Sequence, residues 1–204
     1  MVNLAPKAIA RRALHLAWKT SVWIERQRSP KADGDPYTRK INAIHRLFKI
    51  PNDYTSRGLV LHRECSSLVL LPKALQNRSL LIDRETLKAY SAMYERARED
   101  NVAMSLKWAY RSVDDQSQLI LDRLRWGSSI TQILTSVAAP GYSEHHTGRA
   151  VDIMAPSDST ADFEKTEVFL WLQENAKSFG FTMSYPRENP HNIIYEPWHW
   201  LYES

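Results

Sequence analysis

The spacing of hydrophobic and polar residues predicts a chain whose helices come early and whose strands come mostly late. Apolar residues recur at helical spacing in several segments, which we expect to be helices at 6–28, 38–48, 83–99, 114–126, 129–137 and 161–179. Shorter apolar or alternating segments are expected to be extended at 58–71, 104–110, 150–154, 181–185 and 193–201. Helix and strand do not alternate regularly, so the pattern favours an α+β fold with a mainly antiparallel sheet and flanking helices over a doubly wound fold.

The segment 104–110 has the alternation of a half-buried strand. Met104, Leu106, Trp108 and Tyr110 occupy every second position, which places them on one face. Arg111 follows directly, so this strand is expected to deliver a cation at its end.

Charge is unevenly distributed along the 204 residues. Residues 1–50 contain 11 Lys or Arg and 3 Asp or Glu, whereas the other 154 residues contain 16 and 20. A turn-rich stretch at 29–36 interrupts the basic part. We therefore expect a basic, mainly helical N-terminal arm at residues 1–51, joined to a mildly acidic domain at residues 52–204.

The arm's first helix has a mostly apolar face and a cationic face. The apolar face is formed by Ile9, Ala13, Leu16, Ala17, Trp23 and Ile24, with Trp18 and Val22 on the cationic side. Such a helix can pack against the domain and expose its charges to water, or it can contact an anionic membrane or wall polymer. Basic patches also hold nucleic acid phosphates, but this signal is unspecific and no nucleic acid partner is expected.

The composition is that of an ordinary globular protein, with 43% hydrophobic and 25% charged residues. A chain of this length folds without disulfides or a structural metal, so a bound metal should be functional. Cys65 is the single cysteine, which excludes an intramolecular disulfide. No apolar run approaches the roughly 18 residues of a transmembrane helix, and no signal peptide is visible at the start.

Two short segments contain a high density of residues that can bind metals, at 143–152 and 195–200. An uninterrupted strand would direct His145 and Asp152 to opposite faces, but a break at Gly148 allows both to face one point. Pro197 excludes a helix in the second segment, so Glu196 and His199 can converge only through a local bend.

Two imidazoles and one carboxylate are a common ligand set for catalytic zinc, which keeps its fourth position for water. Glu196 is then the candidate base that accepts the water's proton. The alternative interpretation of both segments is a capped loop with surface aromatics. His146, beside His145, and His191, in a polar loop, are not expected to be ligands.

Three ordered motifs connect this pattern with a known family. The first is Ser-x-His-x-x-Gly-x-Ala-x-Asp at 143–152, the second is Glu-Pro-Trp-His-Trp at 196–200, and the third is Tyr-Arg-Ser followed by Gln at 110–116. Over about residues 53–202 the chain resembles the zinc D,D-carboxypeptidases of the VanY type. These belong to a larger group with D-Ala-D-Ala dipeptidases, lysostaphin-like endopeptidases and the hedgehog signalling domain. Ala109 departs from the family, which usually has glycine there.

The resemblance implies one zinc ion per chain on His145, Asp152 and His199, on the sheet, with Glu196 as general base and acid. It places Arg111 near the substrate, where a permanently charged, forked side chain suits either the oxyanion or a terminal carboxylate. Both roles are open. Further expected substrate contacts are Gln116 and Ser143, and Trp198, which either walls the cleft or belongs to the core.

The implied function is removal of terminal D-alanine from peptidoglycan stem peptides by a D,D-carboxypeptidase. An L,D-carboxypeptidase or an endopeptidase acting on the same cell-wall peptides is an alternative, because similar motifs serve these cleavages. A non-catalytic zinc-containing wall-binding module is the rival from another class, and Glu196 argues against it. The substrate implies the cell envelope as the location, while the oligomeric state is left open.

Overall fold

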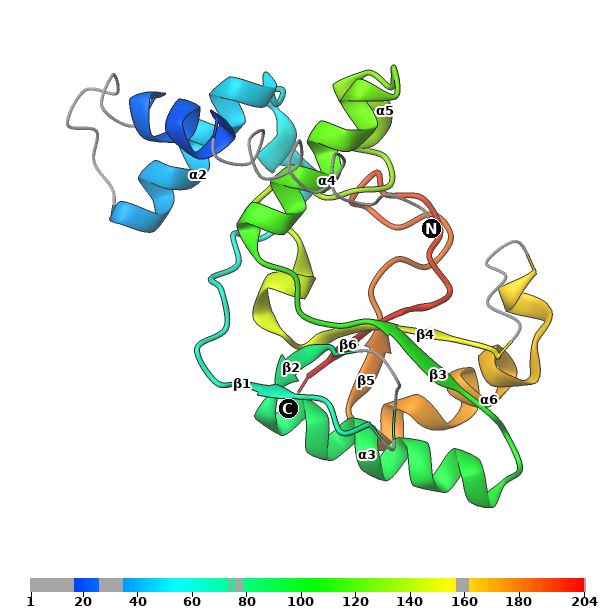
Figure 1. The fold of residues 1–204 in the computed structure, drawn as a ribbon. Coiled ribbons are helices and arrows are strands. Elements are labelled where there is room, and N and C mark those ends of the chain that lie inside the picture. Colours follow the sequence, from blue (N-terminus) through cyan, green and yellow to red (C-terminus); the bar gives the residue numbers. More distant parts are fainter. Residues whose placement is uncertain (1–16, 26–34, 74, 76–78, 157–161, 204) are drawn as a thin grey trace, which may run out of the picture.

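The computed structural model describes residues 17–25, 35–73, 75, 79–156 and 162–203. Within these residues the chain has the α+β architecture that the pattern predicted (Figure 1). A four-stranded antiparallel sheet has the order β3-β4-β6-β5, from β3 (Ser105–Trp108), β4 (Ala150–Met154), β6 (His199–Tyr202) and β5 (Phe181–Met183). A two-stranded antiparallel ribbon pairs β1 (Leu68–Leu70) with β2 (Leu81–Asp83).

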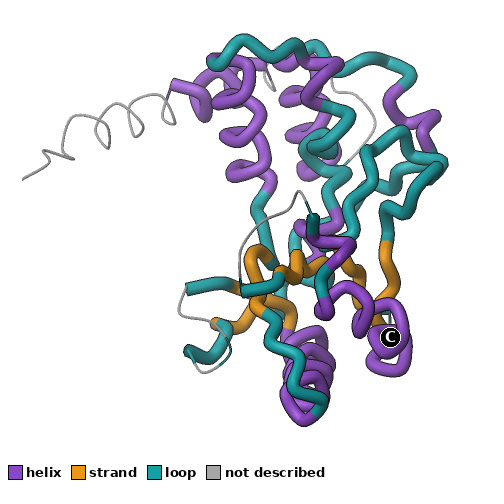
Figure 2. The backbone as a smooth tube through the Cα atoms, turned by 90° about the vertical axis from the view of Figure 1, so that its right-hand side faces the viewer, coloured by secondary structure: helices purple, strands orange, loops and turns teal. Residues whose placement is uncertain are grey.

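The helices lie on both sides of the sheet. They are α2 (Pro36–Phe48), α3 (Arg84–Glu99), α4 (Val113–Arg125), α5 (Ile130–Ile133) and α6 (Glu167–Asn175), with short 3-10 turns η1 (Tyr54–Arg57), η2 (Glu144–Thr147), η3 (Phe163–Lys165) and η4 (Ala176–Phe179). Figures 1 and 2 show the strands in the middle, with α3 and α6 below them and α2, α4 and α5 above them.

This arrangement produces two hydrophobic clusters. The lower cluster joins the sheet to α3 and α6 and includes Ile82, Tyr90, Leu106, Phe163 and Phe181. The upper cluster joins α2, α4 and α5 and includes Ile41, Ile44, Ile120, Ile133 and Leu134. Val151 and Trp200, from the segments 143–152 and 195–200, belong to the lower cluster, while Tyr142, just before the first segment, packs against the upper cluster.

Capping residues explain several helix ends. Asp83 accepts hydrogen bonds from the backbone of Glu85 and Thr86, so α3 begins where the sequence predicted. The long helix expected at 161–179 is instead divided into η3, α6 and η4. Thr166 caps α6 by accepting from the backbone of Phe169, which sets a later start, and Gly180 ends η4 with φ of 81°.

The alternation predicted for 104–110 is correct only as far as Leu106. The pairing of β3 with β4 shifts register between Leu106 and Trp108, as at a β-bulge. Trp108 is therefore 41% exposed and Ala109 is 1% exposed, the reverse of the expected pattern. Arg111 follows this bulge rather than a regular strand.

Two extended segments are shorter than predicted, because their backbones find partners outside a sheet. In 58–71 only β1 is a strand, while the amides of His62 and Cys65 donate to the carbonyls of Gly141 and His146 at 2.8 Å each. In 193–201 the strand β6 begins only at His199.

Residues 17–25 are helical, but the buried face differs from the expected one. Trp18 and Val22 are buried, whereas Trp23 and Ile24 are 60% and 41% exposed. Trp18 stacks on Phe48 of α2 with 4.6 Å between ring centroids, and both belong to the upper cluster. Trp18 and Val22, which the sequence pattern placed on the cationic side of this helix, therefore pack into the upper cluster. Residues 1–16 and 26–34 lie outside the described residues, and the division at residue 52 stays a prediction.

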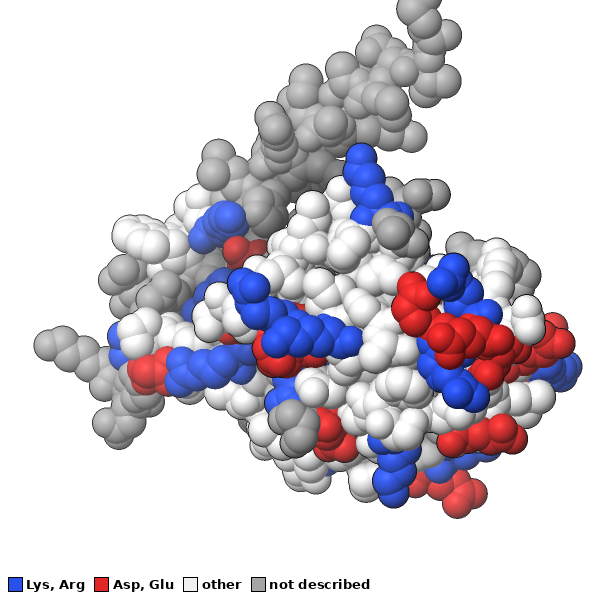
Figure 3. Space-filling model, turned by 90° about the horizontal axis from the view of Figure 1, so that it is seen from below, with Lys and Arg blue, Asp and Glu red and all other residues white. Residues whose placement is uncertain are grey.

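The lower surface has no single sign of charge. Figure 3, viewed from below, shows acidic and basic side chains intermingled. On α3, Lys88 pairs with Glu85 at 2.9 Å and Arg98 with Glu95 at 2.8 Å. Among the described helices, none combines the length and apolar character needed to span a membrane.

Candidate active site

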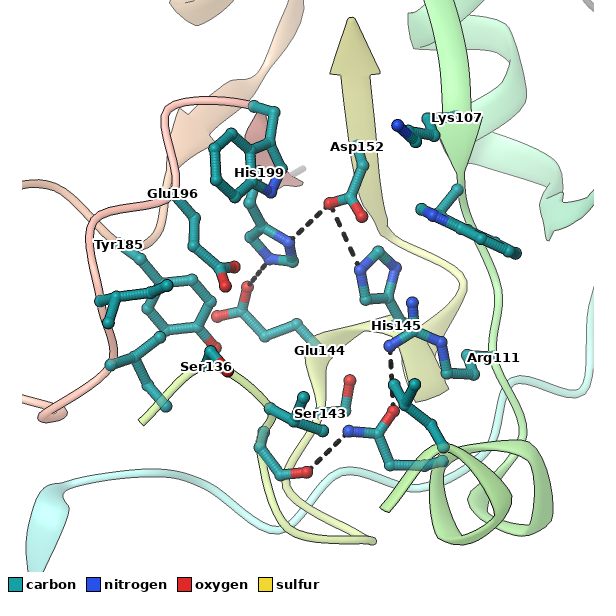
Figure 4. Close-up of a pocket in the computed structure, with 18 of the residues that line it drawn as sticks. Lys107, Arg111, Ser136, Ser143, Glu144, His145, Asp152, Tyr185, Glu196 and His199 are labelled. Atoms are coloured by element: carbon teal, nitrogen blue, oxygen red, sulfur yellow. Dashed lines mark hydrogen bonds and ion pairs between the residues drawn. The ribbon is translucent and has the colours of Figure 1, made fainter. Parts of the chain in front are cut away.

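A cavity of about 320 Å³ lies between the sheet and the α4–α5 region. Figure 4 shows side chains from β4, β6 and the segments around them converging on it. Every residue for which the sequence predicted a role at the site lines this cavity: Arg111, Gln116, Ser143, His145, Asp152, Glu196, Trp198 and His199.

The register of the sheet brings Asp152 and His199 together. They are direct cross-strand partners in the pairing of β4 with β6. Side chains at such positions lie on the same face of the sheet. The Nδ1 atom of His199 is consequently 3.0 Å from Oδ1 of Asp152.

The turn η2 brings His145 to the same carboxylate. The turn ends at Gly148, whose φ of 67° lies in the left-handed region. An added Cβ on Gly148 would lie 2.9 Å from the backbone nitrogen of Asp83, so no larger residue fits without a shift. After this reversal, Nε2 of His145 is 3.4 Å from Oδ1 of Asp152.

These three buried residues can hold one metal ion. Their candidate ligand atoms all lie within 4.8 Å of one another, and no other such group is found in the described parts of the chain. Ligands about 2.1 Å from a tetrahedral zinc ion are separated by about 3.4 Å, which is close to the contacts of 3.0 and 3.4 Å with Asp152. The donor set and its spacing therefore fit zinc.

The outer nitrogen of each imidazole is fixed by another group. Nδ1 of His145 donates to the carbonyl of Ala109 at 2.6 Å, and Nε2 of His199 donates to Oε2 of Glu144 at 2.8 Å. Glu144 also accepts from the Ser184 hydroxyl at 2.7 Å. Such contacts orient metal ligands and raise their basicity. We did not predict Glu144 from the sequence, where it is separated from His199 by 55 positions.

The two carboxylates beside His199 stabilise its protonated form. Burial alone would lower the pKa of His199, but its hydrogen bonds with Asp152 and Glu144 raise that pKa to about 10. Burial alone would raise the pKa of Asp152, but His145 and His199 keep it well below its ordinary value. The cluster therefore favours positive charge, and a metal cation would replace a proton there.

Glu196 is positioned by the bend that the sequence predicted before β6. Its amide donates to the carbonyl of Tyr185 at 3.0 Å, and its carbonyl accepts from the amide of His199 at 3.0 Å. Its carboxylate lines the cavity and makes no hydrogen bond or ion pair with the described residues. Burial raises the pKa of Glu196 to about 7.

Arg111 reaches the cavity from the segment between β3 and α4. Its Nη1 donates to Oε1 of Gln116 at 3.0 Å, and Nε2 of Gln116 donates to the carbonyl of Ala138 at 2.6 Å. Gln116 therefore holds Arg111 in place. The expected contact of Gln116 with the substrate stays a prediction. Burial lowers the pKa of Arg111, and the charges of Asp152 and Glu196 oppose that effect.

The remaining histidines and tryptophans have other contacts. Both ring nitrogens of His146 bond to the backbone, at Arg111 and Gly141. His191 lies 2.9 Å from the carbonyl of Arg57. Trp198 lines the cavity and also packs against the lower cluster, whereas Trp200 is a core residue with 4% exposure.

A pair of imidazoles with one carboxylate, beside a cavity with a further carboxylate, is typical of catalytic zinc sites. Comparison with known families agrees with that class. Residues 79–204 match the model of the VanY family, described as D-alanyl-D-alanine carboxypeptidase. The match covers more than half of the chain, which therefore belongs to the VanY family.

Curated relatives are longer proteins. The chain is 30% identical over 167 residues to the putative carboxypeptidase YodJ of Bacillus subtilis, covering 78% of this chain and 58% of YodJ. It is 32% identical over 121 residues to a D-alanyl-D-alanine carboxypeptidase of Enterococcus faecalis, covering 54% of this chain and 44% of that protein. The chain thus spans about half the length of these relatives.

Solved structures share the fold. The LD-carboxypeptidase LdcB superposes with a TM-score of 0.60 at 29% identity, covering 70% of this chain and 71% of LdcB. VanYB in complex with D-alanine-D-alanine gives 0.56 at 30% identity, covering 76% and 81%. The D,D-pentapeptidase VanY in complex with Zn(II) gives 0.53 at 28% identity, covering 70% and 86%.

Proposed function

We propose that this chain is a zinc-dependent D,D-carboxypeptidase that removes terminal D-alanine from peptidoglycan stem peptides. The placement of Glu196 supports this most directly, because its half-buried carboxylate has no hydrogen-bond partner among the described residues and lines the same cavity as the metal-binding cluster. Burying such a group costs free energy, and zinc binding alone would not require it. The family description and the VanYB complex with D-alanine-D-alanine support the substrate class.

One zinc ion per chain, on His145, Asp152 and His199, is the proposed cofactor. The spacing of these donors fits the ion, and a family relative has been solved in complex with Zn(II). Zinc bound there would polarise the scissile carbonyl and make the attacking water more acidic.

Glu196 is the proposed general base and acid. Its carboxylate takes a proton from the attacking water and returns it to the nitrogen of the leaving D-alanine. Burial raises the pKa of Glu196 to about 7 in the metal-free protein, and zinc bound nearby would favour the carboxylate form that accepts the proton.

Arg111 is proposed to stabilise the oxyanion that forms on the scissile carbonyl. The charges of Asp152 and Glu196 both act on its guanidinium, which places it toward the metal end of the cavity. Its hydrogen bond to Gln116 orients the side chain before substrate arrives. Ser143 and Trp198 line the cavity and are the proposed contacts with the rest of the stem.

An L,D-carboxypeptidase is a second candidate. The similarity to the LD-carboxypeptidase LdcB, with a TM-score of 0.60, favours it specifically. The same ligands, base and cation would serve either cleavage, since they act on the scissile amide and not on the configuration of the residue before it. Endopeptidase action would require the peptide to continue beyond the leaving residue.

Incubation with defined muropeptides, followed by mass spectrometry, tests the proposal. The zinc-loaded protein should remove one alanine from pentapeptide stems, and the Glu196→Gln protein should not. Cleavage of tetrapeptides alone would instead support the L,D activity. If the folded, zinc-loaded protein leaves penta-, tetra- and cross-linked peptides intact, the proposed function is wrong.

The substrate implies a location in the cell envelope, where stem peptides are exposed. A contact of the basic N-terminal arm with an anionic membrane or wall polymer belongs to the same proposal. Within residues 17–25, Trp18 and Val22 of this arm pack against the domain, and Lys19 is 54% exposed and lies 3.8 Å from Asp114.

A further inference from the structure

A second guanidinium, that of Arg123, lines the cavity. Arg123 follows Gln116 by seven positions on α4, which is about two helical turns, so both side chains lie on the same face. Its Nη1 donates to the Ser136 hydroxyl at 2.7 Å. Among the described residues this is the one hydrogen bond of its side chain, which has no carboxylate partner.

The neighbouring arginine on α4 shows the contrast. Arg125 does not line the cavity, is exposed, and pairs with Asp122 at 3.2 Å. Arginine has five N–H donors and can bind a carboxylate through two of them at once. The bond to Ser136 uses one donor of Arg123 and leaves the others for an anion in the cavity.

The two guanidinium groups have different partners in the cavity. Arg111 donates to Gln116 and is acted on by the charges of Asp152 and Glu196, while Arg123 donates to Ser136. Their charges also oppose each other, since Arg123 lowers the pKa of Arg111. An anion bound between α4 and the metal end would relieve this repulsion.

The spacing suits a peptide that spans both sites. Seven residues of helix correspond to about 10 Å, and helical side chains lean back toward the N-terminus of their helix. Arg123 and the metal ligands line one cavity, so a peptide of a few extended residues, at roughly 3.3 Å each, can contact both.

We propose that Arg123, oriented by Ser136, is a specificity-determining residue that binds a carboxylate of the substrate, while Arg111 acts at the scissile carbonyl. This rests on the proposed function. A stem peptide offers two such groups: the C-terminal carboxylate of the leaving residue, and the side-chain carboxylate of its third residue where that residue is diaminopimelate rather than lysine. Both present the same chemistry to a guanidinium.

Binding to a zinc-loaded protein that carries Glu196→Gln tests this without turnover. Pentapeptide stems with a free or amidated C-terminus, each with diaminopimelate or lysine at position three, are titrated by calorimetry.

Arg123→Gln should weaken binding of the free-acid diaminopimelate stem by at least about 10-fold, as expected for a charge-assisted pair. Arg123→Lys should lose less. Arg125→Gln, which removes the same charge outside the cavity, should change the Kd by less than about twofold.

The other stems identify the carboxylate. If Arg123 binds the C-terminus, amidation should abolish the difference in Kd that Arg123→Gln causes; if it binds the side chain, lysine at position three should do so. An equal loss on all four stems, or no loss, overturns the proposal. If the parent protein cleaves stems normally and Arg123→Gln gives either of these two results, only this inference is overturned, and the proposed function stands. If the parent protein cleaves no stem and the Glu196→Gln protein binds none, the proposed function is wrong and this inference with it. Unfolding temperatures and zinc content of each variant check that the fold is retained.

Discussion

His146 holds Arg111 by its backbone. Nδ1 of His146 donates to the carbonyl oxygen of Arg111 at 2.7 Å, while its Nε2 accepts from the amide of Gly141 at 3.1 Å. The carbonyl of His145 accepts from the amide of Arg111 at 3.1 Å. Two adjacent histidines of η2 thus connect the metal cluster to the segment that carries Arg111.

The first prediction follows from that contact. His146→Ala should keep the zinc ion but lower kcat/KM on pentapeptide stems by about 10-fold or more, because Arg111 loses its backbone anchor. His146→Asn places an amide N–H near the position of Nδ1 and should recover part of the activity. Elemental analysis and steady-state kinetics measure both effects. If His146→Ala and Arg111→Lys lower kcat/KM independently, His146 does not act through Arg111.

A second prediction concerns the metal ligands. His145→Ala and His199→Ala should each reduce zinc to well below one ion per chain, because two remaining ligands hold zinc weakly. His191→Ala, whose ring contacts the carbonyl of Arg57, should keep full stoichiometry. Retention of zinc by the double variant of His145 and His199 would disprove the assignment.

The ligands could be predicted because their motifs are local. Gly148 indicated the reversal that joins His145 to Asp152, and Pro197 indicated the bend before His199. Glu144 was missed although it directly precedes His145, since its partner His199 is 55 positions away and comes close only through the packing of η2 against β6. A sequence pattern shows which residues can bind metal, but the groups that orient them depend on tertiary structure.

Two errors have the same origin. An exact period of two placed Trp108 inside, but the register shift after Leu106 exposed it and buried Ala109. Helical spacing placed Trp18 on the outer side of the arm, but its ring stacks on Phe48. Both depend on tertiary contacts, because the pairing with β4 breaks the period at Trp108 and the packing against α2 decides which face of the arm helix is buried.

Gly148 gives a third prediction. Gly148→Ala combines a left-handed backbone with a Cβ 2.9 Å from the Asp83 nitrogen, and should lower stability by about 1–3 kcal/mol and weaken zinc binding by displacing His145. Gly127→Ala is the matched control, because its φ of 92° is also left-handed but nothing lies within 4 Å of the added carbon. It should keep zinc affinity unchanged. Thermal unfolding and competition with a zinc chelator measure the difference.

The fourth prediction is that Arg111→Lys keeps the charge but lowers kcat/KM by roughly 100-fold, as removal of one oxyanion donor does. Lysine cannot reproduce the fork that reaches both Gln116 and the substrate. The loss should be similar for stems with free and amidated C-termini if Arg111 acts on the oxyanion. Wild-type kinetics of this variant on both stems would show that Arg111 has no such role.

The last prediction concerns two effects of Glu196→Gln, on turnover and on stability. In the zinc-loaded protein, the change should lower kcat on pentapeptide stems by at least about 100-fold, because the amide cannot accept a proton. Zinc content and the Kd for substrate should remain close to those of the wild type. Near-normal turnover by this variant would remove Glu196 from the mechanism and favour a different base.

The same variant should stabilise the metal-free protein in a pH-dependent way. The folded state raises the pKa of Glu196 from 4.5 to about 7, so at pH 4 the carboxyl is largely neutral in both states and glutamine gains nothing. Between about pH 4.5 and 7 the unfolded chain loses the proton that the folded chain retains, and wild-type stability falls as pH rises. Glutamine does not titrate, so its advantage should grow across that window and level off above it, at up to roughly 3 kcal/mol. Calorimetric unfolding in the presence of a chelator measures this. Zinc should reduce the advantage, because a nearby cation favours the carboxylate. An advantage that is constant with pH, or absent at pH 8, would show that folding does not raise the pKa of Glu196.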